Sequence, residues 1–540
     1  MNIQHSVVGF YESYVAPWWT SSKFNDVYHI LTRHKKVSIS AAAALVGLCF
    51  LYDRAFRPPR NLRHIPHVAF PTYVLAVMRG MQPKDTARSI TMPAAARSLH
   101  GLYLRFDHNG WAVHVTRPDA IKRVLLKTDL FLKIDTAKNF ENTLTGKVVA
   151  GPNVAFLTGD RWKAQRKIAN PAFNRSMPVQ LFGRLSQKLI HVMDQSIDQP
   201  IEILHFVERY TLDSIAIAGL DYDFDAIGNP DSEWMQRYLR ITQAIEDLPF
   251  LLFPILDNPR FASLVPRRRR AHQDVDAFLA MIDGVIERKR ALLKESGRDL
   301  STIPQREKDL LTLLIEAESD ENGYLTNEEL RSNAAAFFIA GHETTSSALS
   351  SIMYYLAAHQ DVQEKARQEA IRILGDEPKD EMPTLEQLKD VTYINMVIKE
   401  ALRMSPPGTQ IIAREAQEDT ELAGVFIPKG RLVAVDLYEL QHSPDIWRDP
   451  EVFDPERFAR GGEAEQMAGK GLTWIPFSNG AHQCIGMNFS LAEQRVLLLM
   501  LLRKYKWCLP DDSMHKDGLV TYGFGIILPK DLKLSFEKRY

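Results

Sequence analysis

The strongest structural signal in the sequence is the run Phe477-Ser478-Asn479-Gly480-Ala481-His482-Gln483-Cys484-Ile485-Gly486. It places Cys484 between two glycines and before an apolar segment, residues 488–504, that predicts a helix. The unpaired N–H groups and positive dipole end of a helix favour a deprotonated sulfur, so we expect a lowered pKa for Cys484. Gly480 and Gly486 would let the backbone turn tightly and approach a flat cofactor. The alternative is a buried cysteine without a special role.

The pattern Phe-x-x-Gly-x-His-x-Cys-x-Gly in this run resembles the cysteine-ligand loop of the cytochrome P450 family. In that family the cysteine sulfur is the fifth ligand of the haem iron. The resemblance implies that Cys484 ligates the iron of haem b (iron-protoporphyrin IX) and that Phe477, Gly480, His482 and Gly486 belong to the cofactor-binding loop. The family usually has Arg at the position of His482, so a contact between His482 and a haem propionate stays open.

A long helix is predicted in the middle of the chain, because Thr326 and Glu329 have capping-box spacing ahead of a continuous helical pattern. A helix much longer than the globular average of about 11 to 12 residues usually crosses a whole domain. Ala336, Ala340 and Thr344 stand at i, i+4 and i+8, so they share one face. Two of the three are small enough to let a flat macrocycle and dioxygen approach.

The segment Ala340-Gly341-His342-Glu343-Thr344-Thr345 inside this helix resembles the oxygen-activation motif of the same family. The Thr344 hydroxyl can bond the carbonyl of Ala340, which loosens the helix and leaves room for water. The resemblance implies catalytic roles for Thr344 and Glu343 and a cofactor contact for Ala340. Without Cys484 downstream, the same residues would indicate only helix packing and a solvated turn.

A third motif combines Glu400-x-x-Arg403 on a predicted helix with Arg457 in a later segment, residues 453–458. A Glu/Arg pair at i, i+3 is in general an exposed salt bridge of little energetic value. Together with Arg457, the pair resembles the Glu-Arg-Arg network that supports the haem pocket of the family. The resemblance implies a structural role for all three residues.

A fourth motif is Trp162-x-x-x-Arg166. The i, i+4 spacing puts an indole N–H and a guanidinium on one helix face, which suits the carboxylate of a haem propionate. A surface helix with a buried tryptophan is the alternative. Arg414 occupies a position where the family often has another propionate partner.

Composition limits the function without naming it. The chain has 540 residues, of which 45% are hydrophobic and 25% charged, so it can bury a large core. A net charge of −1 gives no global basic field, so no nucleic acid partner is expected. Three cysteines are too few for a disulfide framework, and their spacing does not fit a zinc site. The absence of Cys-x-x-Cys-His excludes covalent c-type haem attachment.

The N-terminal segment, residues 1–56, contains a charge-free apolar run at 37–52 with basic flanks. We interpret the run as a transmembrane anchor, although its 16 residues fall just short of the roughly 17 to 25 expected. A cleaved signal peptide and a buried soluble helix are the alternatives. Residues 57–66 form a basic, proline-rich hinge, and residues 67–540 read as one catalytic domain. That domain is predicted to be mainly α with small β-sheets near 102–115, 420–435 and 521–534.

The resemblance implies a haem-dependent monooxygenase of the eukaryotic microsomal type. Such an enzyme takes two electrons and O₂, inserts one oxygen atom into a C–H bond and releases the other as water. We therefore expect a protein of the endoplasmic reticulum membrane whose catalytic domain faces the cytosol. The sequence after Cys484 is too short for a fused flavin domain, so electrons are expected from a separate NADPH-cytochrome P450 reductase. Four basic residues are candidates for its docking surface, with a solvated helix face as the alternative for each, namely Lys163, Lys167, Arg495 and Lys504.

Family correspondence places the pocket walls in five mainly apolar segments, namely 148–156, 250–256, 337–344, 409–412 and 522–526. They imply a lipophilic substrate. A steroid is the first expectation, from a loose overall resemblance to fungal-type hydroxylases, with a fatty acid or xenobiotic as alternatives. The apolar residues 250–253 and the arginine run 267–270 could contact anionic lipid, or could equally form a loop with a buried flank.

Two functions from other classes stay open. A P450-fold isomerase or dehydratase acting on peroxides needs neither O₂ nor a reductase, but such members typically lose the Glu-Thr pair that this chain keeps. A haem-binding sensor or electron carrier without turnover is the second alternative. NADPH consumption stimulated by a substrate would argue against it.

Overall fold

The computed structural model describes residues 35–107, 109–135, 140, 142–149, 151–174, 177–296, 304, 308–319 and 325–540. The chain divides after Pro59 into two compact units, and each is described by itself. The first unit contains α4 (Lys35–Phe56). Arg57, the residue after this helix, pairs with Asp53 at 3.3 Å. The helix expected over 37–52 therefore forms. Its predicted membrane-spanning character is not found, because no helix within these described ranges is long and apolar enough to cross a membrane.

The second unit contains a five-stranded sheet. Its strands are β1 (Leu102–Asp107), β2 (Gly110–Val115), β3 (Phe131–Lys133), β5 (Gln410–Ala416) and β8 (Leu432–Asp436). They follow the order β1-β2-β8-β5-β3, in which only β2 and β8 are parallel. Apolar side chains of these strands enter one buried cluster that also includes Trp447 and Ile475. The sheet is thereby fixed to the segment that precedes the cysteine loop.

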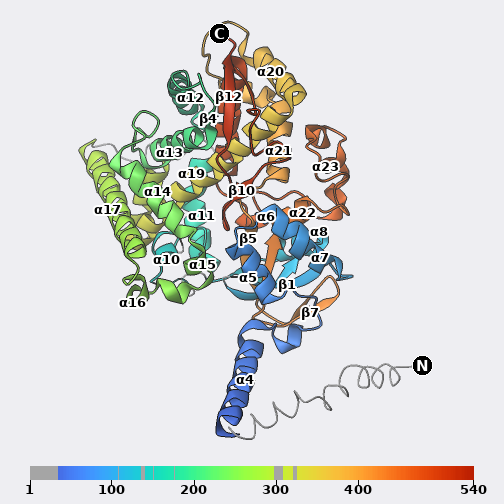
Figure 1. Cartoon of the computed structure of the whole chain (residues 1–540). Coiled ribbons are helices and arrows are strands. Elements are labelled where there is room, and N and C mark those ends of the chain that lie inside the picture. Colours follow the sequence, from blue (N-terminus) through green and yellow to red (C-terminus); the bar gives the residue numbers. More distant parts are fainter. Residues whose placement is uncertain are drawn as a thin grey trace. The chain divides into compact units, whose positions relative to one another are not determined.

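Short helices surround the five-stranded sheet (Figure 1). They are η2 (Arg60–Leu62), α5 (Phe70–Met78), α6 (Pro83–Thr86), the π-helical turn η3 (Ala87–Thr91), α7 (Met92–Ala96), α8 (Pro118–Leu126) and α22 (Leu437–Gln441). Pro83 and Pro118 stand at the first position of α6 and α8, where a proline costs no hydrogen bond.

Most of the second unit is helical. Its other helices are α10 (Leu144–Val148), α11 (Gly159–Asn174), α12 (Val179–Met193), α13 (Ile203–Leu220), α14 (Glu233–Ile245), α15 (Leu248–Leu252), η4 (Pro254–Asp257), α16 (Pro259–Ala262), α17 (Pro266–Glu295), α18 (Leu310–Ser319), α19 (Asn327–Ala358), α20 (Gln360–Leu374), η7 (Gln387–Asp390), α21 (Tyr393–Met404), η8 (Pro455–Phe458), α23 (Glu463–Gln466), η9 (Ala468–Lys470), η10 (Gly480–His482) and α24 (Met487–Lys504).

The long helix α19 forms as predicted. Thr326 and Glu329 make the reciprocal hydrogen bonds of the capping box, and the helix ends at Ala358. It crosses the helical region between α13 and α21 (Figure 1). Most of its side chains are buried in the largest apolar cluster of the protein, so packing on several sides holds it in place.

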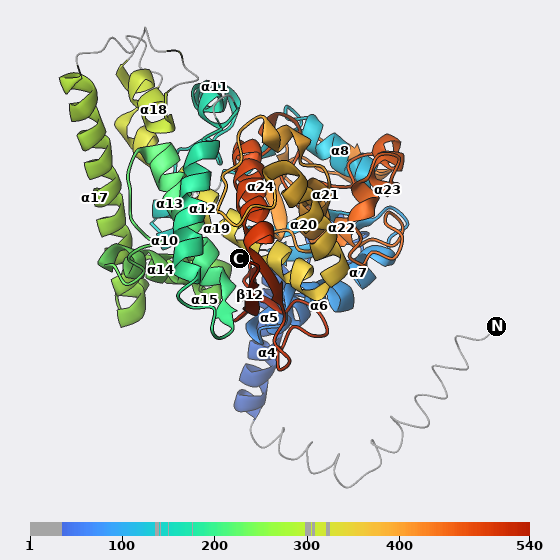
Figure 2. The same cartoon turned by 90° about the horizontal axis from the view of Figure 1, so that it is seen from above.

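The remaining strands form three small sheets. β4 (Ile201–Glu202), β12 (Lys533–Lys538) and β9 (Tyr505–Cys508) make one, while β6 (Thr420–Leu422) pairs with β7 (Val425–Ile427) and β10 (Thr521–Tyr522) with β11 (Leu528–Pro529). Strands therefore occur in all three predicted regions. Figure 2 shows α24 packed beside α12 and α20, which positions the loop that precedes it. The mainly α architecture with small sheets is confirmed.

Candidate functional site

Cys484 lies between η10 and the first residue of α24. Its backbone N–H donates to the carbonyl of Phe477 at 2.9 Å, which closes the loop on itself. Gly480 has a φ of +73°, and a Cβ there would lie 2.9 Å from Leu126 Cδ2 of α8, so both the turn and the packing require glycine. Gly486 has a φ of −83°, which any residue adopts. The tight-turn argument therefore applies to Gly480 alone.

The thiol of Cys484 does not reach the lowered pKa expected from the helix N-terminus. The side chain has exposed surface, yet desolvation raises the pKa of the thiol. The N–H groups of Gly486 and Met487 and the charge of Arg166 act in the opposite direction without outweighing it. A coordinated metal ion deprotonates a thiol outright, so protein groups and metal together would be needed to hold a thiolate.

Four basic side chains gather beside the cysteine loop: Lys133 of β3, Arg166 of α11, Arg414 of β5 and His482 of η10. Burial, followed by the charges of Lys133, Arg414 and Arg166, lowers the pKa of His482 to about 3. Burial and the repulsion of Arg414 and Arg166 likewise lower the pKa of Lys133 to about 7. This mutual electrostatic effect shows that the four groups are close neighbours.

Trp162 lies against the same cluster. Its ring centroid is 4.0 Å from that of His482, and Lys133 Nζ stands 5.7 Å from the indole centroid. Sequence reasoning identified Trp162, Arg166, Arg414 and His482 but missed Lys133. Lys133 carries no motif of its own, because only the pairing of β3 with β5 sets it opposite Arg414.

The cluster fits a cofactor that carries carboxylates. Arg414 Nε and Nη1 and His482 Nδ1 are buried and have no hydrogen-bond partner among the described residues. Burial alone lowers the pKa of Arg414 to about 10. A buried guanidinium without a partner is costly, and so is a buried neutral imidazole nitrogen without one; the two propionates of haem b would provide partners for both, while Cys484 would supply the iron ligand. The donor set therefore fits haem b.

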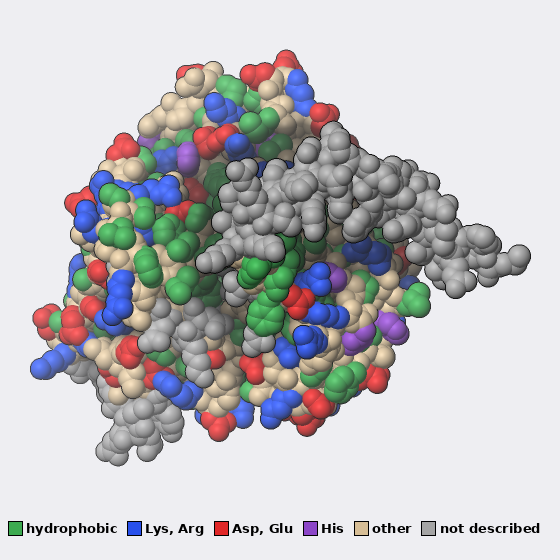
Figure 3. All heavy atoms as spheres, turned by 60° about the horizontal axis from the view of Figure 1, so that its bottom comes forward, with side chains coloured by type: hydrophobic (Ala, Val, Ile, Leu, Met, Phe, Trp, Pro, Cys, Tyr) green, Lys and Arg blue, Asp and Glu red, His purple; other side chains and the backbone are tan. Residues whose placement is uncertain are grey.

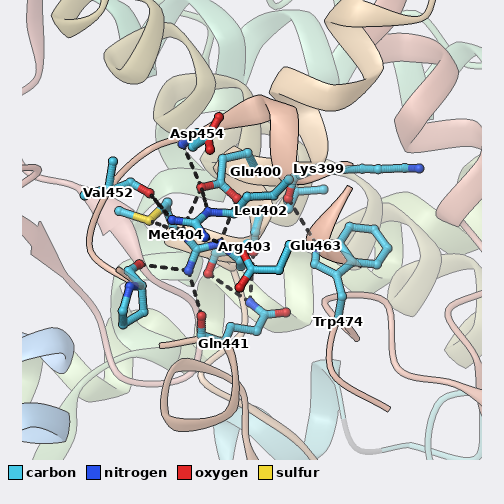
Figure 4. Close-up of polar contacts among 12 residues, drawn as sticks. Lys399, Glu400, Leu402, Arg403, Met404, Gln441, Val452, Asp454, Glu463 and Trp474 are labelled. Atoms are coloured by element: carbon cyan, nitrogen blue, oxygen red, sulfur yellow. Dashed lines mark hydrogen bonds and ion pairs between the residues drawn. The ribbon is translucent and has the colours of Figure 1, made fainter. Parts of the chain in front are cut away.

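Glu400, Arg403 and Arg457 form one network of ion pairs. Figure 4 shows Glu400 and Arg403 together with Gln441, Val452 and Asp454. Arg403 binds the Glu400 carboxylate through Nε at 2.7 Å and Nη2 at 2.8 Å, while Arg457 Nε lies 3.4 Å from Glu400 Oε1. Glu400 and Arg403 are fully buried, which excludes the exposed salt bridge considered above. Arg403 Nη1 also donates to the carbonyls of Gln441 and Pro450, both at 2.8 Å. The network thus connects α21 with the segments that lead into the cysteine loop.

Ala336, Ala340 and Thr344 of α19 line one cavity, as their shared helix face predicts. Thr344 Oγ1 donates to the Ala340 carbonyl at 2.8 Å, which confirms the expected helix-loosening bond. Glu343 lines the same cavity. A hydroxyl and a carboxyl group therefore lie side by side where a substrate would bind.

Glu343 is poised to hold a proton at neutral pH. Desolvation, followed by the charges of Glu246 and Glu208, raises the pKa of Glu343 to about 8. Glu246 also lines the cavity and accepts the N–H groups of Phe524 and Gly525 at 2.9 and 3.2 Å. Sequence reasoning missed Glu246, because its partners lie almost three hundred residues away.

The cavity has a volume of about 770 Å³. All five segments expected to form its walls contribute to it, through residues such as Phe156, Leu251, Ile339, Ile412 and Phe524. The expectation of a mainly apolar wall is incomplete. Charged residues from β1 and the end of β8 also face the cavity, namely Arg105, Asp107 and Asp436.

A sequence model of the family described as Cytochrome P450 matches residues 101–535, which is most of the chain. This chain belongs to the cytochrome P450 family. Cytochrome P450 4F5 of Rattus norvegicus is 31% identical over 375 residues, covering 67% of this chain and 70% of the relative. Cytochrome P450 4F3 of Mus musculus is 31% identical over 419 residues, covering 74% of this chain and 76% of the relative.

The solved structure of the cytochrome P450DA heme domain matches with a TM-score of 0.72 and 23% identity, covering 88% of this chain and 98% of that structure. At this identity the likeness shows the fold. Membership of the family makes the chain a haem b-dependent monooxygenase.

Proposed function

We propose that this cytochrome P450 hydroxylates a lipophilic small molecule, a steroid in the first instance, inside the cavity lined by α19. The observation that carries the proposal is the position of Thr344 and Glu343 on the wall of a 770 Å³ cavity whose other walls are largely apolar. When bound, haem ligated by a thiolate supplies electron density that favours O–O cleavage. The chain must then supply binding, exclusion of water and protons.

Each of these tasks has a residue suited to it. Ala340 and Ala336 have small side chains, so a substrate can approach the cavity-lining face of α19 closely. The Glu343 carboxyl holds a proton at neutral pH, and the Thr344 hydroxyl beside it can pass one on. The raised pKa of Glu343 favours donation, because a carboxylate with an ordinary pKa would already be ionised.

Two measurements test this function. Reduced holoenzyme with CO should absorb at about 450 nm, the family's indication of thiolate ligation, and Cys484→His should lose that band. Lipophiles that shift the haem absorption band should also stimulate NADPH consumption and yield a hydroxylated product. Turnover of a peroxide substrate without O₂ or NADPH would instead support the isomerase or dehydratase function.

The electron donor that we propose is a separate NADPH-cytochrome P450 reductase. Lys163 and Lys167 are exposed on α11, which also carries Arg166 beside Cys484, so they support docking on the cysteine side. Two other candidates do not fit this surface. Lys504 is buried and pairs with Asp380 at 3.3 Å, and Arg495 is half-buried with its Nε on a backbone carbonyl.

We further propose that the enzyme acts at the endoplasmic reticulum membrane, with its catalytic unit facing the cytosol. Large apolar side chains are exposed on residues 253–265, a surface named here the apolar patch; they are Phe253, Ile255, Leu256, Phe261, Leu264 and Val265. Figure 3 shows hydrophobic side chains gathered on the left of the face drawn there, with charged side chains of both signs around them. Exposed apolar side chains that precede the exposed Arg269 and Arg270 in the chain suit an anionic lipid surface.

The apolar patch differs from the lipid contact expected from the sequence. Phe250 stacks under the Arg268 guanidinium at 4.3 Å, and Leu251 lines the cavity, so neither residue supplies an exposed apolar surface. Arg268 is buried against Asp257 at 2.5 Å, whereas Arg269 and Arg270 are exposed. Only part of the arginine run can therefore contact lipid.

A further inference from the structure

One region of the substrate cavity is strongly polar. Arg105 and Asp107 of β1, Asp436 at the end of β8, and Glu439 of α22 line it together, and all four are buried. We call these four residues, with the adjoining Thr86 and Thr91, the polar cluster. No site motif includes any of them, and none belongs to the cysteine loop or to the Glu343–Thr344 pair.

The guanidinium of Arg105 is already engaged by protein carboxylates. Its Nε donates to Asp107 Oδ1 at 2.9 Å and its Nη2 to Asp436 Oδ1 at 3.0 Å. Its flat face lies 4.8 Å from the Tyr73 ring centroid. The group therefore has little capacity left to bind a carboxylate of a ligand, although it faces the cavity.

Acidic groups outnumber basic ones in this region. Asp107, Asp436 and Glu439 stand against Arg105 and against His114, whose Nδ1 is 2.7 Å from Asp436 and whose Nε2 is 3.2 Å from Asp107. Burial lowers the pKa of His114, but Asp436 and Asp107 outweigh it and raise the pKa overall. Burial, followed by the charge of Asp436, raises the pKa of Glu439 to about 7, so at neutral pH two cations face two carboxylates and a third that is partly ionised. The cluster therefore has no positive charge left over to attract a further anion.

Two threonine hydroxyls lie at the polar cluster, and one of them has no partner. Thr91, in the π-helical turn η3, donates its hydroxyl to Glu439 Oε1 at 2.5 Å. Such π-helical turns are rare in proteins overall, but those that occur are often at functional sites. Thr86, at the end of α6, is 7% exposed and lines the cavity, and its Oγ1 has no hydrogen-bond partner among the described residues. An unpartnered buried hydroxyl is costly, and a ligand in the cavity can satisfy it.

We propose that the substrate carries a hydroxyl group that binds at the polar cluster, where it hydrogen-bonds Thr86 Oγ1, while its apolar body reaches the Thr344 region of the same cavity. The inference rests on the proposed hydroxylase function and narrows its substrate class to a lipophilic alcohol. A carboxylate in the same place would meet acidic groups and an Arg105 that is already paired. Fatty acids are therefore disfavoured relative to alcohols of equal length.

The test compares ligands that differ in one polar group, with haem-loaded full-length enzyme and affinity measured by calorimetry. The probes are a 3-hydroxysteroid with its 3-methyl ether, and dodecanol with dodecanoic acid. Each alcohol should bind about tenfold more tightly than its partner, the equivalent of one hydrogen bond. Equal affinities, tighter binding of the acid or the ether, or no binding of either alcohol would overturn the proposal.

Thr86→Val places a methyl group where the hydroxyl lacks a partner. It should weaken alcohol binding about tenfold, leave binding of the methyl ether unchanged and leave the thermal midpoint of the ligand-free enzyme no lower. Thr521→Val alters a cavity-lining threonine outside the cluster and should change neither affinity. A Thr86→Val enzyme that binds alcohol normally, or that loses both ligands together with stability, contradicts the assignment. The CO band of the same preparation reports the haem-thiolate centre separately, so loss of that band would instead reject the proposed function.

Discussion

Glu343 is the side chain whose ionisation bears most directly on the proposed reaction. Its pKa of about 8 arises first from desolvation and then from the charges of Glu246 and Glu208. Below that pH the carboxyl group holds a proton, and above it the proton is lost. The supply of protons should therefore fall as pH rises through about 8.

The amount of product formed per NADPH consumed should depend on pH. In the wild-type enzyme this ratio should decline as the pH is raised from 7 to 9, because deprotonated Glu343 cannot donate a proton. Glu343→Gln removes the titrating group, so its ratio should be low throughout and lack the decline. A Gln variant that retains the wild-type pH dependence would assign the titration to another group.

The hydroxyl of Thr344 is the second group proposed to deliver protons. Thr344→Ala should bind substrate and accept electrons normally, yet release much of its reducing equivalents as hydrogen peroxide. Losing a positioned proton donor typically costs about 10² to 10⁴-fold in rate, although water in the space left by the side chain can restore part of it. We therefore expect a lower ratio of product to NADPH, measured with peroxide counted in parallel.

Thr344→Ser is the matched control for that experiment. Serine keeps a hydroxyl able to bond the Ala340 carbonyl, as Thr344 does at 2.8 Å. It should preserve most of the wild-type ratio. An unchanged ratio in Thr344→Ala itself would mean that another group supplies the proton.

At the scale of elements, the Glu400–Arg403–Arg457 network holds α21 to the segments before the cysteine loop. Removing one partner of a buried ion pair leaves an uncompensated charge, at a cost of about 3 to 5 kcal/mol. Glu400→Ala, Arg403→Ala and Arg457→Ala should each give little haem-loaded protein, measured as haem bound per chain. Lys399→Ala changes an exposed neighbour on α21 and should load haem normally. Normal haem content in all three network variants would refute the structural assignment.

The contacts within and between elements differ in whether the sequence alone could predict them. The capping box at Thr326 and the bond from Thr344 to Ala340 could be predicted, because both partners lie within one helical turn. Lys133 could not, because β3 meets β5 only in the folded sheet. The polar cluster was missed for the same reason, since it joins β1 to α22 across more than three hundred residues. Contacts within one helical turn can thus be predicted from the sequence, whereas contacts between elements far apart in the sequence cannot.

Electrostatics set a second limit on what could be predicted. The dipole of α24 is readable from the sequence, and it favours a thiolate at Cys484. The desolvation that outweighs it depends on every atom packed around the sulfur, so the direction of the pKa shift appears only in the structure. The same applies to Glu343, where burial decides the sign.

At the scale of the whole molecule, the chain divides after Pro59, and every residue proposed to bind haem or substrate lies in the second unit. Deleting residues 1–56 should therefore leave the CO band at about 450 nm intact. The truncated protein still contains the apolar patch, so it should pellet with anionic vesicles, and high salt should weaken that binding only in part, because the apolar contribution is not screened.

The apolar patch gives the sharpest test of membrane contact. In the truncated protein, replacing Ile255 and Leu264, which are 72% and 77% exposed, by serine should abolish pelleting with vesicles while the CO band persists. Two large aliphatic side chains buried in lipid contribute roughly 1.5 to 3 kcal/mol each, enough to reduce binding more than a hundredfold. Leu99→Ser is the control, because Leu99 is 96% exposed and lies outside the patch. Vesicle binding that survives the double substitution, or that Leu99→Ser weakens equally, would show that the patch is not the lipid contact.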